Sequence, residues 1–555
     1  MTSLVLSLSA LTLGISIFIL KRRPSTLAFL RGPKPVSYLL GPFFERDNVR
    51  HLICVAGHEY EISHQTDAGQ LEFEWVKIYG PTIRIFGCFH EEVLMIADPM
   101  GLQHIFQSQN YPKARDIRLI AERVFGKGLL WATGEAHQRH RRALNPAFST
   151  QNLKKFVPLF QETTLELVKK WNARLEGNAA VVLNMAQWMP KITLDVIGRS
   201  AFEFNFGLLD GTADYNELYR TMRDMFLDSK SSSTLTVLYD AIRRRIPERI
   251  GFKMYTTKED RRLSAFLSAA QRAARNILLR KQEVEMPNAN SDDDKDILSV
   301  LIHATKHDDH RKKLHEDEII SQMATIILAG NETTSSTMSW MLYELSKHAD
   351  SQTRVHEEIA ILRAQTACHV SLTSAQYDSM PYFNAVIKET LRLHPILPIL
   401  VREADEHDTI PLSILVKSKT GSLLPDVPIH KGQRILLHLG AYNRLTQVWG
   451  DDADSWNPVR FIDEKKEVVV GMYGNLYLAI CVSFVLSIRR SNTQSEIRVM
   501  ELQVVLFELI ESFEFSLPAE EIDIQRIPSI LMVPMIRGKP ELGVQLPLQV
   551  KQRTQ

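Results

Sequence analysis

The longest helix that this sequence predicts lies at Asp317–His348, DEIISQMATIILAGNETTSSTMSWMLYELSKH, and the rest of the fold is expected to pack around it. Acidic residues begin the stretch, and a lysine and a histidine end it, which is the charge order that the helix dipole favours. Apolar side chains recur at helical spacing, and no proline interrupts them. At about 1.5 Å per residue the helix would be roughly 45–50 Å long, enough to cross a large domain.

The middle of this predicted helix, Ala329-Gly330-Asn331-Glu332-Thr333, places a glycine, an acid and a hydroxyl within an apolar run. A glycine inside a helix costs about 1 kcal/mol relative to alanine, but it allows close approach by another group. A flat ligand lying against Ala329 and Gly330 would use that space, and Glu332 and Thr333 could relay protons beside it. The alternative is a local weak point in the helix, with the Thr333 hydroxyl bonded to the Ala329 carbonyl.

Composition argues against several other classes of protein. The 555-residue chain has 66 basic and 65 acidic residues, so it shows no electrostatic signature of nucleic-acid binding or of an acidic partner. Its cysteines, Cys54, Cys88, Cys368 and Cys481, are far apart and form no CxxC pair, which argues against a disulfide framework or a structural zinc site. They fit a reducing, cytosol-facing environment. With 45% hydrophobic residues, the chain can bury a substantial core.

The N-terminus predicts a membrane anchor. Residues Ser3–Leu20 carry no charge and form a run of about 18 residues, the lower limit for crossing a bilayer. A cleaved signal peptide is the alternative, but Lys21-Arg22-Arg23 follows the apolar run and no clear small-residue cleavage site is present. The positive-inside rule then puts the chain after this basic cluster in the cytosol. We expect residues 1–23 to be the anchor with its basic flank, and residues 24–47, which are rich in proline, to be a stiff hinge.

The remaining residues, 48–555, are predicted to form a single catalytic domain that is mainly α with smaller β-sheets, an α+β fold. Residues 48–70 lack periodicity and are expected to form a loop, whereas residues 74–96 alternate enough to predict strands, most clearly at Thr82–Phe86. Strand-like sequence also runs from residue 401 to 437. Further helices are predicted at residues 134–142, 382–393 and 500–513, and within 153–267.

Two groups of charged residues are candidates for a function. His137 and Arg141 lie four residues apart on one face of a basic helix, where they could hold an anion such as a carboxylate. The commoner use of such a basic run is a solvated face. Glu389 and Arg392 lie three residues apart on another predicted helix. An exposed pair of this kind contributes only about 0.3–0.5 kcal/mol, whereas a buried pair needs further hydrogen-bond partners.

Motifs of other catalytic chemistries are absent from the sequence. The triplets that begin at His90, His315 and His356 each lack the second histidine of a zinc-protease HExxH motif. The chain has no GxSxG nucleophile elbow and no phosphate-binding GxxxxGK loop. It also has no flavin or nicotinamide motif, so a redox reaction would need electrons from a separate protein.

Taken together, these residues resemble the cytochrome P450 family of heme-thiolate monooxygenases over nearly the whole chain. Ala329-Gly330-Asn331-Glu332-Thr333 is similar to the oxygen-activating motif on that family's long central helix, and Glu389-Thr390-Leu391-Arg392 is similar to its ExxR pair. Asn457-Pro458-Val459-Arg460-Phe461 is similar to the segment that supplies a further arginine to the same ion cluster. The anchor and hinge resemble the microsomal type, and the overall sequence is most similar to fungal members.

The resemblance implies three sets of site residues, which are catalytic, cofactor-binding and structural. The catalytic pair would be Glu332 and Thr333, which would deliver protons during dioxygen activation. The residues expected to bind heme b, against its face or at its propionates, are Ala329, Gly330, His137, Arg141 and Arg402. The residues expected to form a structural ion cluster beneath the heme are Glu389, Arg392 and Arg460.

One segment departs from the family pattern. The family places the cysteine thiolate that binds the iron, and that favours O–O cleavage, in a Phe-x-x-Gly-x-Arg-x-Cys-x-Gly loop. Gly471–Leu476 is similar to the approach to that loop, and Val499–Gln503 to the helix after it, but residues 477–497 contain no glycine. Cys481, the only cysteine there and the expected iron ligand, lacks the usual glycine and arginine neighbours, so we expect poor heme binding or an abnormal ligand. A splice variant or a gene-model error would explain such a local replacement.

The expected function is that of a heme-dependent monooxygenase, which inserts one atom of dioxygen into a lipophilic small molecule in secondary metabolism or in xenobiotic oxidation. Its expected partners are an NADPH-dependent reductase, the substrate and a membrane, with no nucleic acid. The resemblance predicts a single-pass protein of the endoplasmic reticulum membrane with its catalytic domain in the cytosol. The alternative is a catalytically dead, heme-free, membrane-anchored relative that keeps the fold.

Overall fold

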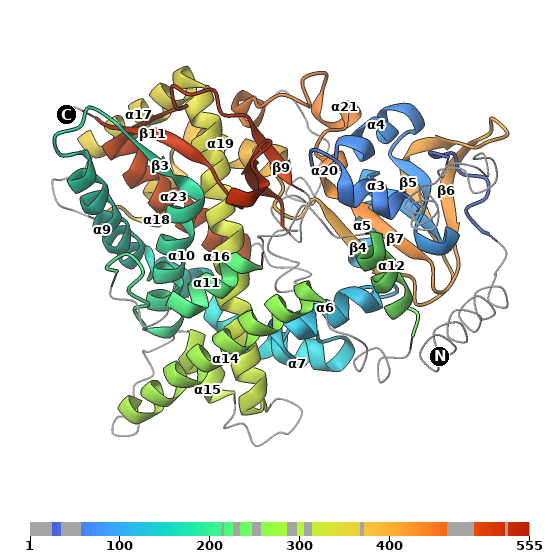
Figure 1. Cartoon of the computed structure of the whole chain (residues 1–555), viewed down its shortest axis with the longest axis horizontal. Coiled ribbons are helices and arrows are strands. Elements are labelled where there is room, and N and C mark those ends of the chain that lie inside the picture. Colours follow the sequence, from blue (N-terminus) through green and yellow to red (C-terminus); the bar gives the residue numbers. More distant parts are fainter. Residues whose placement is uncertain are drawn as a thin grey trace, which may run out of the picture.

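The computed structural model describes residues 25–34, 57–211, 216–225, 234–246, 257–285, 297–304, 313–366, 371–462, 493–527 and 531–553. Figure 1 shows two regions: helices gather around the long α16, and most of the strands lie on the other side of the molecule with α3, α4 and α5. A helical majority with small sheets confirms the α+β class that the sequence predicts.

Helices and strands have the following bounds within the described residues. The α-helices are α3 (His58–His64), α4 (Gln70–Tyr79), α5 (Pro99–Gln107), α6 (Arg115–Phe125), α7 (Gly134–Leu144), α8 (Thr150–Lys154), α9 (Val157–Leu175), α10 (Met185–Phe202), α11 (Asn216–Asp224), α12 (Thr234–Arg243), α14 (Lys258–Glu285), α15 (Ile297–His303), α16 (Glu316–Lys347), α17 (Ala349–Ala364), α18 (Ser374–Asp378), α19 (Pro381–Leu393), α20 (Leu439–Tyr442), α21 (Thr446–Trp449) and α23 (Thr493–Ser512). The strands are β1 (Thr82–Phe86), β2 (Glu92–Ile96), β3 (Val181–Asn184), β4 (Ile399–Glu403), β5 (Asp408–Lys417), β6 (Leu423–Ile429), β7 (Arg434–His438), β8 (Phe513–Ser516), β9 (Ile524–Ile527), β10 (Val533–Ile536) and β11 (Pro547–Gln552). Short 3-10 turns are η1 (Cys88–His90), η2 (Asn145–Phe148), η3 (Pro458–Phe461) and η4 (Pro540–Leu542).

Helix α16 confirms the helix predicted from the central stretch and is buried along nearly its whole length. The carboxylate of Glu318 accepts a hydrogen bond from the backbone N–H of His315, which caps the first turn. With 32 residues the helix is about 48 Å long. Apolar side chains cover more than one of its faces because α10, α14 and α19 all pack against it, so α16 forms the centre of the helical region (Figure 1).

The largest sheet has the strand order β1-β2-β7-β4. Strand β1 pairs antiparallel with β2, β2 pairs parallel with β7, and β7 pairs antiparallel with β4. Alternate residues of the first two strands, Ile83, Ile85, Val93 and Met95, are buried together with Trp75 of α4. Leu94 and Ile96, on the other face of β2, are fully buried in the main core, so this hairpin is covered on both faces rather than half-buried.

Two expectations for the start of the catalytic domain are wrong in part. The sequence predicts a loop for residues 48–70, but residues 58–64 form α3. It predicts strands for residues 74–96, but residues 74–79 complete α4, and only β1 and β2 are extended. Helices of 7 and 10 residues show little periodicity, and tertiary packing rather than intrinsic propensity stabilises them.

The other predicted elements are present. The helices predicted at residues 134–142, 382–393 and 500–513 correspond to α7, α19 and α23, and strands β4 to β7 occupy the strand-like region after residue 398.

The described part of the predicted hinge, residues 25–34, contains neither helix nor strand and packs on the catalytic domain. Leu27 and Leu30 are fully buried in the main hydrophobic core, and the carbonyl of Arg31 accepts a hydrogen bond from the N–H of Arg84 in β1 at 3.0 Å. The predicted anchor, residues 1–23, lies outside the described residues. Among the helices that are described, none is long and apolar enough to cross a membrane.

Candidate active site

Helix α10 packs against the centre of α16 at the residues that the sequence singles out. Asn331 is fully buried and joins the two helices: its Nδ2 donates to the carbonyl of Pro190 at 3.1 Å, and its Oδ1 accepts from the hydroxyl of Thr193 at 2.7 Å. A Cβ added to Gly330 would lie 2.8 Å from Cδ1 of Ile197, so the glycine allows the two helices to approach closely. The close neighbour of Gly330 is therefore helix α10, and the expected contact between Gly330 and heme stays a prediction.

Thr333 uses its hydroxyl within α16. Its Oγ1 donates to the carbonyl of Ala329 at 2.7 Å, which is the local role that the sequence offers as the alternative to a proton relay. Thr337 repeats the pattern by donating to the carbonyl of Thr333 at 2.8 Å. Both threonines are buried, so these bonds satisfy hydroxyls that water does not reach. Because a hydroxyl that donates one bond can still accept another, this geometry leaves Thr333 able to take part in a relay.

Glu332 lines a pocket whose walls come mainly from α10, α11, α16 and β10. Its polar lining residues are Arg223, Glu332, Ser335, Ser336 and Ser339. Burial raises the pKa of Glu332 to about 8, and the charge of Arg223 opposes this shift only in part. A carboxyl with this pKa holds its proton at neutral pH and releases it near pH 8, which suits a buried general acid. The sequence identifies Glu332 but gives no sign of Arg223, because α11 is far away along the chain.

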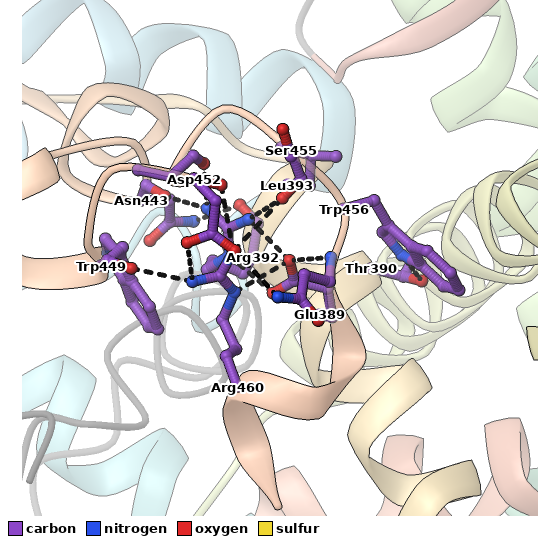
Figure 2. Close-up of polar contacts among 12 residues, drawn as sticks. Glu389, Thr390, Arg392, Leu393, Asn443, Trp449, Asp452, Ser455, Trp456 and Arg460 are labelled. Carbon is purple, nitrogen blue, oxygen red and sulfur yellow. Dashed lines mark hydrogen bonds and ion pairs between the residues drawn. The ribbon is translucent and has the colours of Figure 1, made fainter. Parts of the chain in front are cut away.

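Figure 2 shows the ion cluster predicted from the sequence. Arg392 binds Glu389 through two hydrogen bonds of 2.7 Å, one from Nε and one from a terminal guanidinium nitrogen, and neither side chain is exposed. Arg460 adds a contact from its Nε to Oε1 of Glu389 at 3.1 Å. The structure therefore brings together all three residues that were expected to form the structural cluster, in a buried setting.

The remaining donors of the two arginines bind mainly to backbone carbonyls. Arg392 donates to the carbonyls of Ala453 at 2.6 Å and Ser455 at 2.9 Å, and Arg460 donates to that of Trp449 at 2.8 Å (Figure 2). These are the further partners that a buried ion pair needs, and they join the segment between α21 and η3 to α19. Sequence reasoning missed these partners because a carbonyl has no residue-type signature.

Helix α7 carries His137 and Arg141, the basic residues predicted at the heme propionates, and both are partly buried. Their neighbours join α7 to α16: Arg139 and His140 both bind the carboxylate of Glu318, with His140 Nε2 at 3.1 Å from Oε1. Burial lowers the pKa of His140 although this carboxylate acts in the opposite direction. The basic run of α7 is therefore not wholly a solvated face, because part of it packs against the central helix.

Arg402, the third residue predicted at the propionates, lies on β4. Among the described residues no carboxylate faces its guanidinium, and burial lowers its pKa to about 10. A cation inside a protein is stable only with a partner of opposite charge or with hydrogen-bond acceptors. The carboxylates of heme would supply that charge, so Arg402 fits the cofactor that the resemblance implies.

Cys481, the predicted iron ligand, lies outside the described residues. Within them, Cys88 is fully buried, and both burial and the neighbouring Glu59 raise the pKa of its thiol. A thiol in this setting resists deprotonation, so Cys88 does not offer a second thiolate. No group of three or more His, Cys, Asp or Glu residues in the described segments could hold a metal ion.

A long buried helix with an acid–hydroxyl pair at its centre, together with a buried Glu–Arg–Arg cluster, is typical of heme monooxygenases. A family model described as Cytochrome P450 matches residues 52–474 of the sequence. The chain belongs to the cytochrome P450 family, and it is accordingly an oxidoreductase enzyme.

Curated relatives agree with this assignment. Cytochrome P450 monooxygenase 128 of Postia placenta is 29% identical over 547 residues, which cover 95% of this chain and 93% of that protein. Cytochrome P450 monooxygenase claW of Ampulloclitocybe clavipes is 28% identical over 546 residues, covering 96% of this chain and 94% of that protein. Both organisms are fungi, as the resemblance predicts. The family match ends at residue 474, just before the segment in which the ligand loop departs from the family pattern.

Proposed function

We propose that this chain is a heme-dependent monooxygenase that inserts one atom of dioxygen into a lipophilic small molecule, with electrons from a separate NADPH-dependent reductase. The observation that carries the proposal is Glu332, a buried carboxyl with a pKa near 8, placed next to Thr333 on the central helix. The relatives, which are named as monooxygenases, support the same reaction class.

When bound, heme would supply the iron chemistry that activates dioxygen. Arg402 would bind a heme carboxylate, with His137 and Arg141 of α7 as further partners. Glu332 holds a proton at neutral pH, and it lines a pocket together with Arg223 and three serines of α16. Thr333 can pass a proton on by exchanging its bond to the Ala329 carbonyl, while the burial of this part of α16 excludes bulk water from the reaction.

We further infer that residues 1–23 anchor the enzyme in the endoplasmic reticulum membrane, with residues 48–555 in the cytosol. The uncharged run and the basic residues after it support this arrangement. Deleting residues 1–23 is expected to move the protein from the membrane fraction toward soluble or peripheral fractions. A mature chain that begins near residue 25 would instead show a cleaved signal peptide.

A second candidate function, a catalytically dead and heme-free relative, is favoured by the ligand loop. Residues 477–497 contain no glycine, and the family match stops before them. A thiolate ligand needs backbone N–H donors and a tight turn to stay deprotonated. If a splice variant or gene-model error replaced this segment, the gene would encode a normal loop in another transcript, which sequencing the transcript across Gly474 to Glu501 would reveal.

The absorbance spectrum of the full-length protein, reduced and exposed to carbon monoxide, separates the two candidates. The monooxygenase predicts the spectrum of a thiolate-bound heme, and this spectrum is expected to disappear in Cys481→Ala. A protein that shows no heme absorbance after expression with excess heme would refute the proposal in favour of the heme-free relative.

A further inference from the structure

Helix α16 has a second polar face beside the residues that are expected at heme. Four polar residues recur there at helical spacing and line one pocket: Glu332, Ser335, Ser336 and Ser339. Ala329 and Thr333, which are expected to face heme and dioxygen, are not part of the wall of this pocket. The pocket therefore lies on the side of α16 that faces α10, α11 and the C-terminal strand β10, and it needs an explanation of its own.

Two of these four side chains leave their hydrogen-bonding capacity unused. Ser335 donates to the carbonyl of Glu332 at 3.3 Å, and Ser339 donates to the carbonyl of Ser335 at 2.8 Å. By contrast, the carboxyl of Glu332 and the hydroxyl of Ser336 have no hydrogen-bond partner among the described residues, although the two residues are only 7% and 8% exposed. Buried polar groups of this kind normally have a partner, so their presence in a pocket wall indicates a polar ligand.

The charge beside the pocket is positive. Arg223 of α11 lines the pocket and donates to the hydroxyl of Tyr219 at 3.3 Å. The guanidinium carbon of Arg223 and Nζ of Lys191 each lie 5.9 Å from the centroid of the Tyr219 ring. Burial lowers the pKa of Lys191, and the charges of Arg174 and Arg223 act in the same direction. In the described segments neither Lys191 nor Arg223 forms an ion pair with a carboxylate, so these cations favour an anion.

The alternative is that Arg223 serves only as the counter-ion of Glu332. No hydrogen bond joins the two side chains, and burial raises the pKa of Glu332 to about 8 against the charge of Arg223, so the carboxyl is neutral at pH 7. A neutral carboxyl, the Ser336 hydroxyl and the guanidinium all donate hydrogen bonds, which together suit the two oxygens of a carboxylate. The rest of the wall is apolar and suits a short apolar group attached to that carboxylate: Ala186, Pro190, Val533, Pro534 and Val544.

We propose that this pocket is an effector site for a small monocarboxylate with an apolar body, held by the charge of Arg223 and by hydrogen bonds from Glu332 and Ser336. The site goes beyond the proposed monooxygenase reaction, because its ligand would contact α16 on a face that Ala329 and Thr333 do not share. A bound anion would favour the protonated form of the Glu332 carboxyl. The effector would therefore act on the group that carries the proton in the proposed relay.

The test is isothermal titration calorimetry of the full-length chain with butanoate and hexanoate at neutral pH, in a buffer that contains sodium chloride. Butanamide and hexanamide have the same shape without the charge. Wild type is expected to bind at least one acid about tenfold more tightly than its amide. Arg223→Met is expected to weaken binding of that acid about tenfold and to leave the far-UV circular dichroism spectrum unchanged. Arg220→Met, at an exposed arginine of the same helix that does not line the pocket, is the matched control and is expected to have no effect.

Equal affinity of wild type for acids and amides, or no binding of either acid, would overturn the proposal, and this comparison needs no variant that could fail to fold. Unchanged affinity of the acid in a folded Arg223→Met would overturn it too. Ser336→Ala, which removes one donor and no charge, is expected to weaken binding of the acid by only about threefold. None of these measurements depends on heme. A missing thiolate-type carbon monoxide spectrum would therefore refute the proposed monooxygenase alone, and missing carboxylate binding would refute this site alone.

Discussion

The substitution Glu389→Gln tests whether the buried ion cluster stabilises the fold. Glu389 is the acid that binds Arg392, through two bonds of 2.7 Å, and neither side chain is exposed. Glutamine has the same shape, but it removes the charge and turns one acceptor into a donor that faces the guanidinium. Breaking a buried pair in this way costs about 3–5 kcal/mol, because the arginine stays buried without an acid. Arg460 is less affected, since Asp452 still binds it at 3.0 Å.

Urea-induced unfolding of the full-length chain, followed by far-UV circular dichroism, measures this loss as a change in the unfolding free energy. The matched control is Glu217→Gln. Glu217 binds Arg272 at 2.8 Å, but the two side chains are 55% and 54% exposed, so this identical change is expected to cost about 0–1 kcal/mol.

A loss in Glu389→Gln no larger than in Glu217→Gln would refute the reasoning. It would mean that the desolvation of the two charges cancels their attraction, so that the cluster serves another purpose than stability. Heme content is not part of this readout, and the result therefore holds whether or not the ligand loop is functional.

Two further predictions concern the proton-bearing groups. With reductase present, Thr333→Ala is expected to lower the amount of product per NADPH and to release peroxide, because proton delivery of this kind contributes about 100- to 10,000-fold to the reaction rate. An unchanged amount of product per NADPH would show that the Thr333 hydroxyl serves only its hydrogen bond to the Ala329 carbonyl. The pKa of Glu332 in the folded protein, about 8, lies above the ordinary value of 4.5, so the folded state binds more protons than the unfolded state, and stability should fall as pH rises through this interval. Unfolding free energies of the wild type should show this slope, and those of Glu332→Gln should lack it.

The parts of the fold that the sequence predicts are those with a strong local pattern. Helix α16 is found because acids, apolar periodicity and terminal basic residues agree over its whole length. The Glu389–Arg392 pair is found because a spacing of three residues places both side chains on one helix face. The burial of this ion pair makes its loss more costly in unfolding free energy, and this burial depends on packing against the segment between α21 and η3.

The parts that the sequence does not predict depend on contacts between distant segments. The sequence allows a weak point in the helix at the stretch that contains Asn331, yet the Asn331 side chain joins α16 to Pro190 and Thr193 of α10. Helices α3 and α4 are too short to show a period.

The two groups of residues expected to bind heme lie in separate segments of the sequence. His137 and Arg141 lie on α7 and Arg402 lies on β4, and the fold around them is stabilised by α16 and the Glu389 cluster. None of these elements includes the segment at residues 477–497. A local replacement in that segment would therefore change the iron ligand without changing the residues expected at the heme carboxylates. Porphyrin binding and oxygenase activity are accordingly expected to be separable in this protein, with the first set by the cations and the second by the residue that binds the iron.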